Sequence, residues 1–544
     1  MINRQKFVRA ATIVVAGSAL ALSGACSSTD TKAPSGTTGG GGEPGTTTSG
    51  STTTGGGGSG TGGSGPVDLG DSVLQHHKSP SRDGVYTQPL ITPEKAAAMH
   101  LDPTFTAVTQ GATYAQPLFL DGGGTGKDLV FAATELNWIY ALDAATGATV
   151  WSKKVGEPVK LTSLPCGNID VVGITGTPVI DGATRTIYAD AMTSPDGGAT
   201  KKHLITGLSV DTGETRPGFP IDVSAVAKNG NLSFDSAIEN QRGALLISGG
   251  TLYVPYGGHY GDCGAFHGWV VGVPLANPIA VQAWATLGQG GGTWAPGGLS
   301  SEGNGVYLAT GNTFGAATWL GGEAIIHLGA GPVFTNAPTD YFAPTDWKAL
   351  DSGDIDIGGS GPILFDLPGA VPSKLTVALG KNGKAYLLDR TNLGGVSKAV
   401  AEAVVATNEI INAAAVVTTG TATYVIFNAN GAKCPAGQSG NLVALAIGVG
   451  SPPTITTAWC DDEHGLGSPM VTTTDGHAGA VVWTVGQQGD SRLHGFDADT
   501  GKEIFTGGGS GDAMTGLKRF ATPIAAKGRI FAAGTSAVYA FTAN

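Results

Sequence analysis

The stretch IYALDAATG, at residues 139–147, recurs along this chain and decides its fold. It returns as LHGFDADTG at residues 493–501 and, more loosely, as GLSVDTG at residues 207–213. Each copy begins with the alternating apolar residues of a strand and ends in a tight turn, where Gly supplies the positive φ. A return strand with Trp151 or Phe505 follows two of the copies. The repeat therefore predicts a series of β-hairpins.

A second repeated element precedes the hairpins: a small residue or Gln, then Pro, then apolar residues. Its copies contain Pro117, Pro178, Pro296, Pro362, Pro469 and Pro523. Two of the intervals are close to twice the others, so we expect unit starts without Pro near Arg242 and Ala413. Eight units with a period of roughly 50 to 65 residues then fill residues 115–544, and about four short strands fit in each, as in a propeller blade. The sequence predicts an all-β fold, a single eight-bladed β-propeller with four-stranded blades.

The last unit ends at Asn544 after three strands, which leaves its sheet without an outer strand. The segment TFTAVT at residues 104–109 can fill that place. Pairing of this N-terminal strand with the last blade would close the ring and protect an exposed edge. Just before it, Thr92 and Pro93 predict a short helix with a capping Thr and with Pro at the first helical position.

The N-terminus has the features of an exported lipoprotein. Three basic residues within the first nine precede an apolar run at residues 10–22, which is too short to span a bilayer and is typical of a signal peptide. The segment LSGAC at residues 22–26 resembles a lipobox, although SGA before the Cys would also suit ordinary signal peptidase. We expect a signal peptide at residues 1–25 and a lipid anchor at Cys26. Ser27 resembles a signal for the outer membrane of the bacterial cell envelope.

After the N-terminal segment, differences in composition divide the chain into a tether and a folded domain. From Thr29 to about residue 80 the chain is Gly, Ser and Thr with few apolar side chains, which cannot offset the entropy of ordering. We predict a disordered tether at residues 26–80 and the propeller at residues 81–544. The formal charge of −12 becomes −15 without the signal peptide, which argues against nucleic acid as a partner. We expect a monomer.

The hairpin ALDAATG with Trp151 after it resembles the repeat of quinoproteins that depend on pyrroloquinoline quinone (PQQ). It also resembles the repeat of the lipoprotein subunit of the outer-membrane β-barrel assembly machine. A bacterial family of PQQ-like propeller proteins without an assigned reaction is similar in five further motifs. These are SRDGVY at residues 81–86, PCGNID at 165–170, GITGTP at 173–178, ENQR at 239–242 and HGW at 267–269. The resemblance covers residues 81–544 and implies a fold more than a chemistry.

In the quinoprotein enzymes that this repeat resembles, carboxylate and Asn ligands hold a calcium or lanthanide ion, and an Asp acts as general base. Many also carry a disulfide between adjacent Cys residues. This sequence has no adjacent Cys pair and no Cys-x-x-Cys-His haem motif. We therefore predict no cofactor and keep PQQ with calcium as the alternative.

The Cys residues indicate an oxidising compartment, because four remain besides Cys26 and four Cys allow three disulfide pairings. Cys434 and Cys460 fall in one predicted blade, so we expect them to pair, which leaves Cys166 with Cys263. The segment HYGDCGAFH at residues 259–267 could instead bind copper or zinc through its His and Cys. Cys263 cannot be both a thiolate ligand and a disulfide partner.

Polar residues are densest in the predicted loops between the second and third units. They are Cys166, Asn168, Asp170, Glu239, Asn240, Arg242, His259 and His267. Loops at a channel mouth converge on ligands while the blades hold them rigid, so these residues form our candidate ligand site. The alternative is that they satisfy buried backbone groups at the joint between blades. A separate acidic run, Asp351, Asp354 and Asp356, either binds an ion or caps a turn.

Three functions remain. The first, which we favour, is a cell-envelope lipoprotein whose non-catalytic propeller binds or scaffolds an envelope protein or a glycan. The second is a PQQ- and calcium-dependent dehydrogenase of alcohols or sugars, which only the repeat supports. The third is a carbohydrate-binding or hydrolytic propeller, although no Gly-x-Ser-x-Gly element favours hydrolysis. We predict no catalytic residue.

Overall fold

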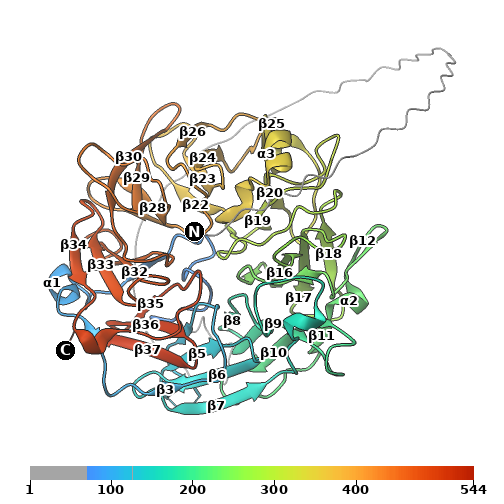
Figure 1. The fold of residues 1–544 in the computed structure, drawn as a ribbon, viewed down its shortest axis with the longest axis horizontal. Coiled ribbons are helices and arrows are strands. Elements are labelled where there is room, and N and C mark those ends of the chain that lie inside the picture. Colours follow the sequence, from blue (N-terminus) through green and yellow to red (C-terminus); the bar gives the residue numbers. More distant parts are fainter. Residues whose placement is uncertain (1–69, 125, 544) are drawn as a thin grey trace, which may run out of the picture. The chain divides into compact units, whose positions relative to one another are not determined.

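The computed structural model describes residues 70–124 and 126–543, which form β-strands joined by turns and loops, with three short α-helices. Eight four-stranded blades follow one another around a ring, as Figure 1 shows. The predicted all-β, eight-bladed propeller is confirmed. The predicted signal peptide, Cys26 and the tether up to residue 69 lie outside the described residues. Among the described residues, no helix is both long and apolar enough to cross a membrane.

The first four blades use strands in chain order, with one exception. Blade 1 is β4 (Leu118–Leu120), β5 (Leu129–Ala133), β6 (Trp138–Asp143) and β7 (Thr149–Lys154); blade 2 is β8 (Val179–Asp181), β9 (Thr186–Thr193), β10 (Lys202–Ser209) and β11 (Ile221–Asp222); blade 3 is β15 (Leu246–Ser248), β16 (Thr251–Gly258), β17 (Trp269–Pro274) and β18 (Gln282–Ala285), with β14 (Glu239–Asn240) beside β16; blade 4 is β19 (Val306–Thr310), β20 (Ala324–Leu328), β21 (Tyr341–Pro344) and β25 (Gly395–Ser397). The exception is β25, which pairs parallel with β21 although three strands of blade 5 lie between them in the chain.

The last four blades end with the closure of the ring. Blade 5 is β22 (Ile363–Asp366), β23 (Lys374–Leu379), β24 (Lys384–Asp389) and β26 (Ala401–Val404); blade 6 is β27 (Ala415–Thr418), β28 (Thr423–Asn428), β29 (Leu442–Gly448) and β30 (Thr454–Asp461); blade 7 is β31 (Met470–Thr473), β32 (Val481–Val485), β33 (Leu493–Asp497) and β34 (Glu503–Thr506); blade 8 is β35 (Ile524–Ala526), β36 (Arg529–Gly534) and β37 (Ala537–Thr542). The second strand of each blade is covered on both faces. All residues of β5, β9 and β32 are buried, which explains their apolar runs.

Blade 8 is completed by the start of the domain. Strand β37 pairs antiparallel with β2 (His100–Leu101) and β3 (Ala107–Val108). Figure 1 shows this red end of the chain beside the blue start. The predicted closure by residues 104–109 is confirmed. The predicted helix is α1 (Pro93–Ala96), and Thr92 Oγ1 accepts a hydrogen bond from the Lys95 amide at 3.3 Å.

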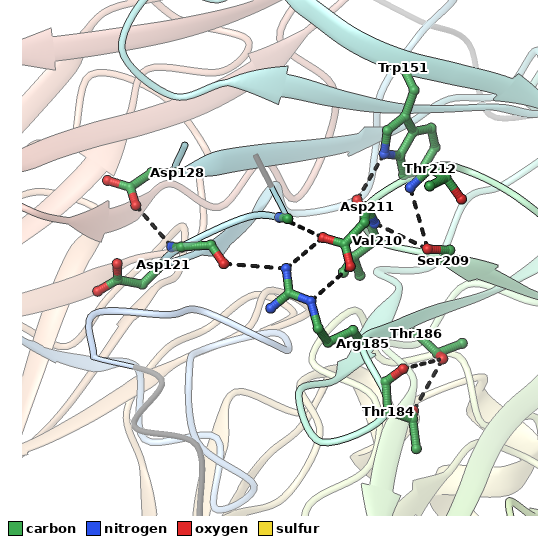
Figure 2. A network of polar contacts seen from close by, with 12 residues as sticks. Asp121, Asp128, Trp151, Thr184, Arg185, Thr186, Ser209, Val210, Asp211 and Thr212 are labelled. Atoms are coloured by element: carbon green, nitrogen blue, oxygen red, sulfur yellow. Dashed lines mark hydrogen bonds and ion pairs between the residues drawn. The ribbon is translucent and has the colours of Figure 1, made fainter. Parts of the chain in front are cut away.

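The repeated hairpin also joins neighbouring blades. Trp151 on β7 donates from Nε1 to the Val210 carbonyl of blade 2 at 2.8 Å (Figure 2). Trp459 on β30 makes the equivalent bond to Ala498 of blade 7 at 2.9 Å. The hairpin turn of blade 7 brings Gly501, with φ +73°, against the ring of Trp459. The Thr-Gly turn and the Trp of the repeat are therefore contacts between blades.

Figure 2 shows a second contact at the joint between blades 1 and 2. Arg185 Nε and Nη2 donate to the two carboxylate oxygens of Asp211 at 2.8 and 2.6 Å. Asp211 also accepts the Gly124 amide of blade 1 at 2.7 Å. A two-point ion pair on blade 2 thus fixes a turn of blade 1.

The segment at residues 73–88, called the N-terminal strap, contacts every blade. Its backbone and side-chain hydrogen bonds reach, in blade order, Phe119, Ile180, Leu245, Ser301, Leu364, Val416, Val471 and Gly528. Arg82 lies at its centre with 2% of its surface exposed and donates to the carbonyls of Leu245 and Leu299 at 2.8 and 2.7 Å. Part of the strap, β1 (Val85–Thr87), pairs parallel with β31.

The predicted tether boundary at residue 80 is corrected by the strap. Val73, His76 and His77 are buried, so residues that composition assigns to the tether belong to the folded domain. The few apolar side chains of this stretch find their partners in distant blades. Their burial could not be read from the local composition.

Candidate functional site

A cavity of about 790 Å³ lies inside the ring and is lined by loops from blades 1 to 8. His76 of the strap lines it and is 2% exposed, whereas Tyr260, on a loop of blade 3, is 61% exposed. The strap therefore lines the deep part of the cavity and the loops form its mouth. A volume of this size falls within the range of small-molecule sites, roughly 300 to 1,000 Å³.

One disulfide joins two loops near the cavity, and a second lies within one blade. Cys166 is bonded to Cys263, which joins the loop before blade 2's inner strand to the loop between β16 and β17. Cys434 is bonded to Cys460 within blade 6. Both pairs are those expected from the sequence. Because Cys263 is in a disulfide, the alternative of a thiolate metal ligand in residues 259–267 is wrong.

The structure divides the predicted ligand residues into two groups. Asn168 and Arg242 line the cavity, and Asp170 lines an adjoining pocket of about 330 Å³. Glu239, Asn240 and His259 are buried in the blade 3 region and do not line the cavity.

The buried group supports the fold of the loops. Glu239 Oε1 accepts hydrogen bonds from the His267 amide and from Trp269 Nε1, both at 3.0 Å. His267 Nδ1 lies 2.9 Å from the Thr286 carbonyl. Burial lowers the pKa of His259 to about 3, and the charges of His203 and Arg242 add to the shift. For Glu239 and His267 the structural alternative holds, whereas His259 Nε2 and Asn240 Oδ1 are buried without a hydrogen-bond partner.

Trp294 is the aromatic centre of the cavity, and no motif in the sequence around it marks it as a site residue. The guanidinium of Arg242 lies 5.6 Å from its ring centroid and Lys381 Nζ lies 5.5 Å from it. Lys381 also pairs with Asp354 at 2.9 Å and with Asp356 at 2.7 Å. Burial lowers the pKa of Lys381, but the two carboxylates outweigh it and the net shift is upward.

The acidic run at residues 351–356 is used in these internal contacts. Asp356 accepts the Asn312 amide at 2.7 Å besides pairing with Lys381. Asp351 accepts the hydroxyl of Thr313 at 2.7 Å. The side chains of the run therefore bind protein groups separately, and the hypothesis of an ion held jointly by all three is wrong.

Unlike Lys381, Arg242 makes no ion pair with any residue that the structure describes. Its Nη2 donates to the Gly258 carbonyl at 3.2 Å, and its Nε is buried without a hydrogen-bond partner. Burial lowers the pKa of Arg242 to about 10 despite the opposing charges of Asp262 and Asp356. The cavity thus contains a guanidinium whose hydrogen-bonding capacity is largely unused.

Buried carboxyl groups fix the loops around the cavity. Glu135 accepts the Gly173 amide at 2.6 Å and the Thr175 hydroxyl at 2.8 Å. Burial raises its pKa to about 7 in spite of these bonds. Glu323 accepts the Ile357 amide at 2.9 Å, and burial raises its pKa to about 10. In both residues, burial therefore favours the protonated carboxyl.

Comparison with known proteins gives the fold. No protein-family model matches the chain, and no curated protein matches it. A quinohemoprotein alcohol dehydrogenase from Pseudomonas putida HK5 matches with a TM-score of 0.60 and 13% identity, over 87% of this chain and 80% of that chain. The fold is that of the quinoprotein β-propellers. A europium-containing methanol dehydrogenase matches with a TM-score of 0.55 and 16% identity, over 85% and 89% of the two chains.

Because these two quinoproteins share so few identical residues with this chain, they are evidence for its fold alone. BamB from Moraxella catarrhalis matches with 14% identity over 79% of this chain and 99% of that chain. Its TM-score of 0.44 is too low to support an argument about this protein.

The cavity does not contain the ligand set that PQQ with calcium requires. Asp354 and Asp356, which line it, are both paired with Lys381, and Glu409 lies 3.7 Å from an Arg side chain. Among the described acidic residues of the lining, only Asp262 makes no ion pair. Calcium needs several free oxygen ligands that converge on one point. The residues present do not fit this group, and no reaction step is derived through it.

Proposed function

We propose that this chain is a lipid-anchored protein of the bacterial cell envelope whose propeller is a non-catalytic binding module. Its ligand enters the central cavity and carries an acidic group beside a ring. The lipobox-like sequence ending at Cys26 supports the anchor. The unpaired guanidinium of Arg242 is the observation that carries the binding proposal.

A guanidinium removed from water costs free energy unless an anion or several acceptors compensate it. Arg242 has one hydrogen bond, to the Gly258 carbonyl, and lines the cavity. The planar guanidinium matches a carboxylate in a two-point hydrogen bond. A ligand carboxylate would therefore supply the missing counter-charge.

The ring of the ligand is proposed from Trp294, which lines the cavity next to Arg242. Aromatic rings and the apolar faces of sugars both pack on indole. Aromatic acids and sugar acids are therefore the two ligand classes that suit this pair. Two further basic lining residues, Lys518 and Arg519, lie toward the mouth and would attract either class.

Thermal unfolding of the full mature-length chain with Cys26→Ser tests the proposal. Benzene-1,3,5-tricarboxylate, glucuronate and glucose serve as an aromatic acid, a sugar acid and a neutral sugar. We expect an acidic probe to raise Tm, since a ligand at 100 times its Kd stabilises by about 2.7 kcal/mol. Arg242→Gln should abolish the rise. Arg519→Gln, which removes an exposed cation at the mouth, should weaken it only slightly.

The same titration separates the alternatives. A rise in Tm with PQQ that requires calcium and survives Arg242→Gln would favour the dehydrogenase. Equal shifts with glucose and glucuronate would favour a carbohydrate-binding propeller that does not recognise charge. If neither acidic probe shifts Tm, the proposal of an acidic ligand at Arg242 is contradicted.

A further inference from the structure

His494, on β33 of blade 7, has a carboxylate at each ring nitrogen. Its Nδ1 lies 2.8 Å from Glu503 Oε1, and its Nε2 lies 2.8 Å from Asp490 Oδ2. A neutral imidazole has one N–H, so it can donate to only one of two carboxylates. The other contact would place a lone pair against an anionic oxygen. A cation, either a second proton or a metal ion, is needed to hold this arrangement together.

A second imidazole approaches the same carboxylate. His464 Nε2 lies 3.4 Å from Glu503 Oε1, and the His464 and His494 rings are stacked with centroids 4.3 Å apart. One ligand atom from each of His464, His494 and Glu503 lies within 4.8 Å of the other two. In the part of the chain that the structure describes, this is the one such group of His, Cys, Asp or Glu.

The backbone holds the three side chains from separate elements. His494 and Glu503 come from the paired strands β33 and β34, and His464 comes from the loop after β30 of blade 6. The His464 carbonyl accepts the Asp490 amide at 3.1 Å, which ties that loop to the β32–β33 loop. His464 itself has φ +58°, an uncommon conformation for a residue other than Gly. The cluster is thus positioned by ordered structure at the joint of blades 6 and 7.

We propose that His464, His494 and Glu503 bind one divalent transition-metal ion, with zinc as the reference metal. Two imidazoles and one carboxylate are zinc ligands, and in a tetrahedral site with bonds near 2.1 Å the ligand atoms lie about 3.4 Å apart. The distances of 2.8 and 3.4 Å to Glu503 Oε1 are close to that spacing. The ion takes the place of the proton between His494 Nδ1 and Glu503.

Asp490 completes the site as a positioning residue. It accepts the Nε2–H of His494, the arrangement in which a carboxylate orients a metal-bound imidazole. The two carboxylates balance the charge of a divalent ion. His494 has 2% of its side chain exposed and His464 has 38%, so the ion would enter past His464 and keep a water as its fourth ligand. Arg492, two residues before His494 in the chain, donates to the Gly507 carbonyl at 2.8 Å.

This site is independent of the central cavity, because none of its three ligands lines that cavity. A bound ion would connect the loop after blade 6 to the outer strands of blade 7. It would therefore act on the stability of this joint, whatever ligand the cavity binds.

Isothermal titration of the untagged, metal-stripped full chain with ZnCl2 tests the site. The Cys26→Ser background and non-reducing buffer leave no free thiol to bind zinc. We expect one equivalent bound with a Kd of micromolar or tighter, and no comparable binding of CaCl2 or MgCl2. His464→Gln should weaken binding at least 10-fold. Asp490→Asn should weaken it about 10-fold to 100-fold, the usual range for such partners.

Two controls make the outcome specific. His477→Gln changes an exposed His that contacts the Thr418 carbonyl outside the cluster and should leave zinc binding unchanged. Zinc K-edge absorption of the loaded chain should show two imidazole ligands in the parent and one in His464→Gln. An absence of binding at 100 µM zinc overturns the proposal. Binding that His464→Gln and Asp490→Asn leave unchanged also overturns it.

Discussion

Glu135 is a buried carboxyl whose ionisation couples stability to pH. Burial raises its pKa from 4.5 to about 7. The folded chain therefore binds more protons at this residue than the unfolded chain between about pH 4.5 and 7, and its contribution to stability is lost as the pH rises through that range. The loss amounts to about 3 kcal/mol in the free energy of unfolding.

Glu135→Gln should remove this part of the pH dependence. The oxygen of a neutral amide can accept the Gly173 amide hydrogen, and its NH2 can donate to Thr175 Oγ1, which would then accept a hydrogen bond where it now donates one. We expect the variant to be more stable than the parent above pH 7 and similar to it near pH 4.5. Urea unfolding at a series of pH values measures the difference. Glu157→Gln, in an exposed pair with Lys154, is the control, and an unchanged slope in Glu135→Gln would contradict the assignment.

The site was predictable only where one stretch of sequence carried several of its residues. Asn168 and Arg242 lie in polar loop segments that stand out in the sequence, and both line the cavity. Trp294 and Lys381 were missed because each stands alone among ordinary loop residues. Their meeting at 5.5 Å depends on the convergence of blades 3, 4 and 5, which spacing along the chain does not encode.

The hairpin is the element whose sequence carries the most structural information. Alternating apolar residues and the Thr-Gly turn predict it locally, because each signal acts within a few residues. Strand β25 gave no such signal. It pairs parallel with β21 of the preceding blade, and a parallel partner far along the chain leaves no turn to recognise. The number of blades was therefore predictable, whereas this exchange of an edge strand was not.

Substitution of Gly501 in the repeated turn should cost more free energy of unfolding than its positive φ alone explains. A Cβ there would lie 2.6 Å from the Trp459 ring, whereas Gly250, with the same φ of +73°, has nothing within 4 Å. The left-handed backbone costs an added side chain roughly 1–2 kcal/mol at either position. We expect Gly501→Ala to lower the free energy of unfolding by more than Gly250→Ala, because it also displaces the Trp between blades 6 and 7. Urea denaturation of both variants compares them, and equal losses would show that the Trp459 contact contributes nothing.

At the scale of the whole molecule, closure depends on a segment that precedes the first blade. The ring is joined once by β37 with β2 and β3, and a second time by the N-terminal strap, which bonds to all eight blades. A blade in a ring contacts only its two neighbours directly. Without a shared partner, the stability of the ring would therefore be a sum of contacts between neighbouring blades. The strap gives distant blades a common partner and should make unfolding more cooperative.

Truncation separates the strap from the sequence before it. A chain that begins at Gly70 keeps every strap contact and should unfold as the mature chain does. A chain that begins at Pro89 loses them, including both Arg82 bonds to the buried carbonyls of Leu245 and Leu299, each of which costs about 1–3 kcal/mol when left unsatisfied. We expect a lower Tm and a broader transition by calorimetry. A synthetic peptide of residues 70–88 should restore part of the Tm, and the role assigned to the strap is wrong if the Pro89 chain melts like the Gly70 chain.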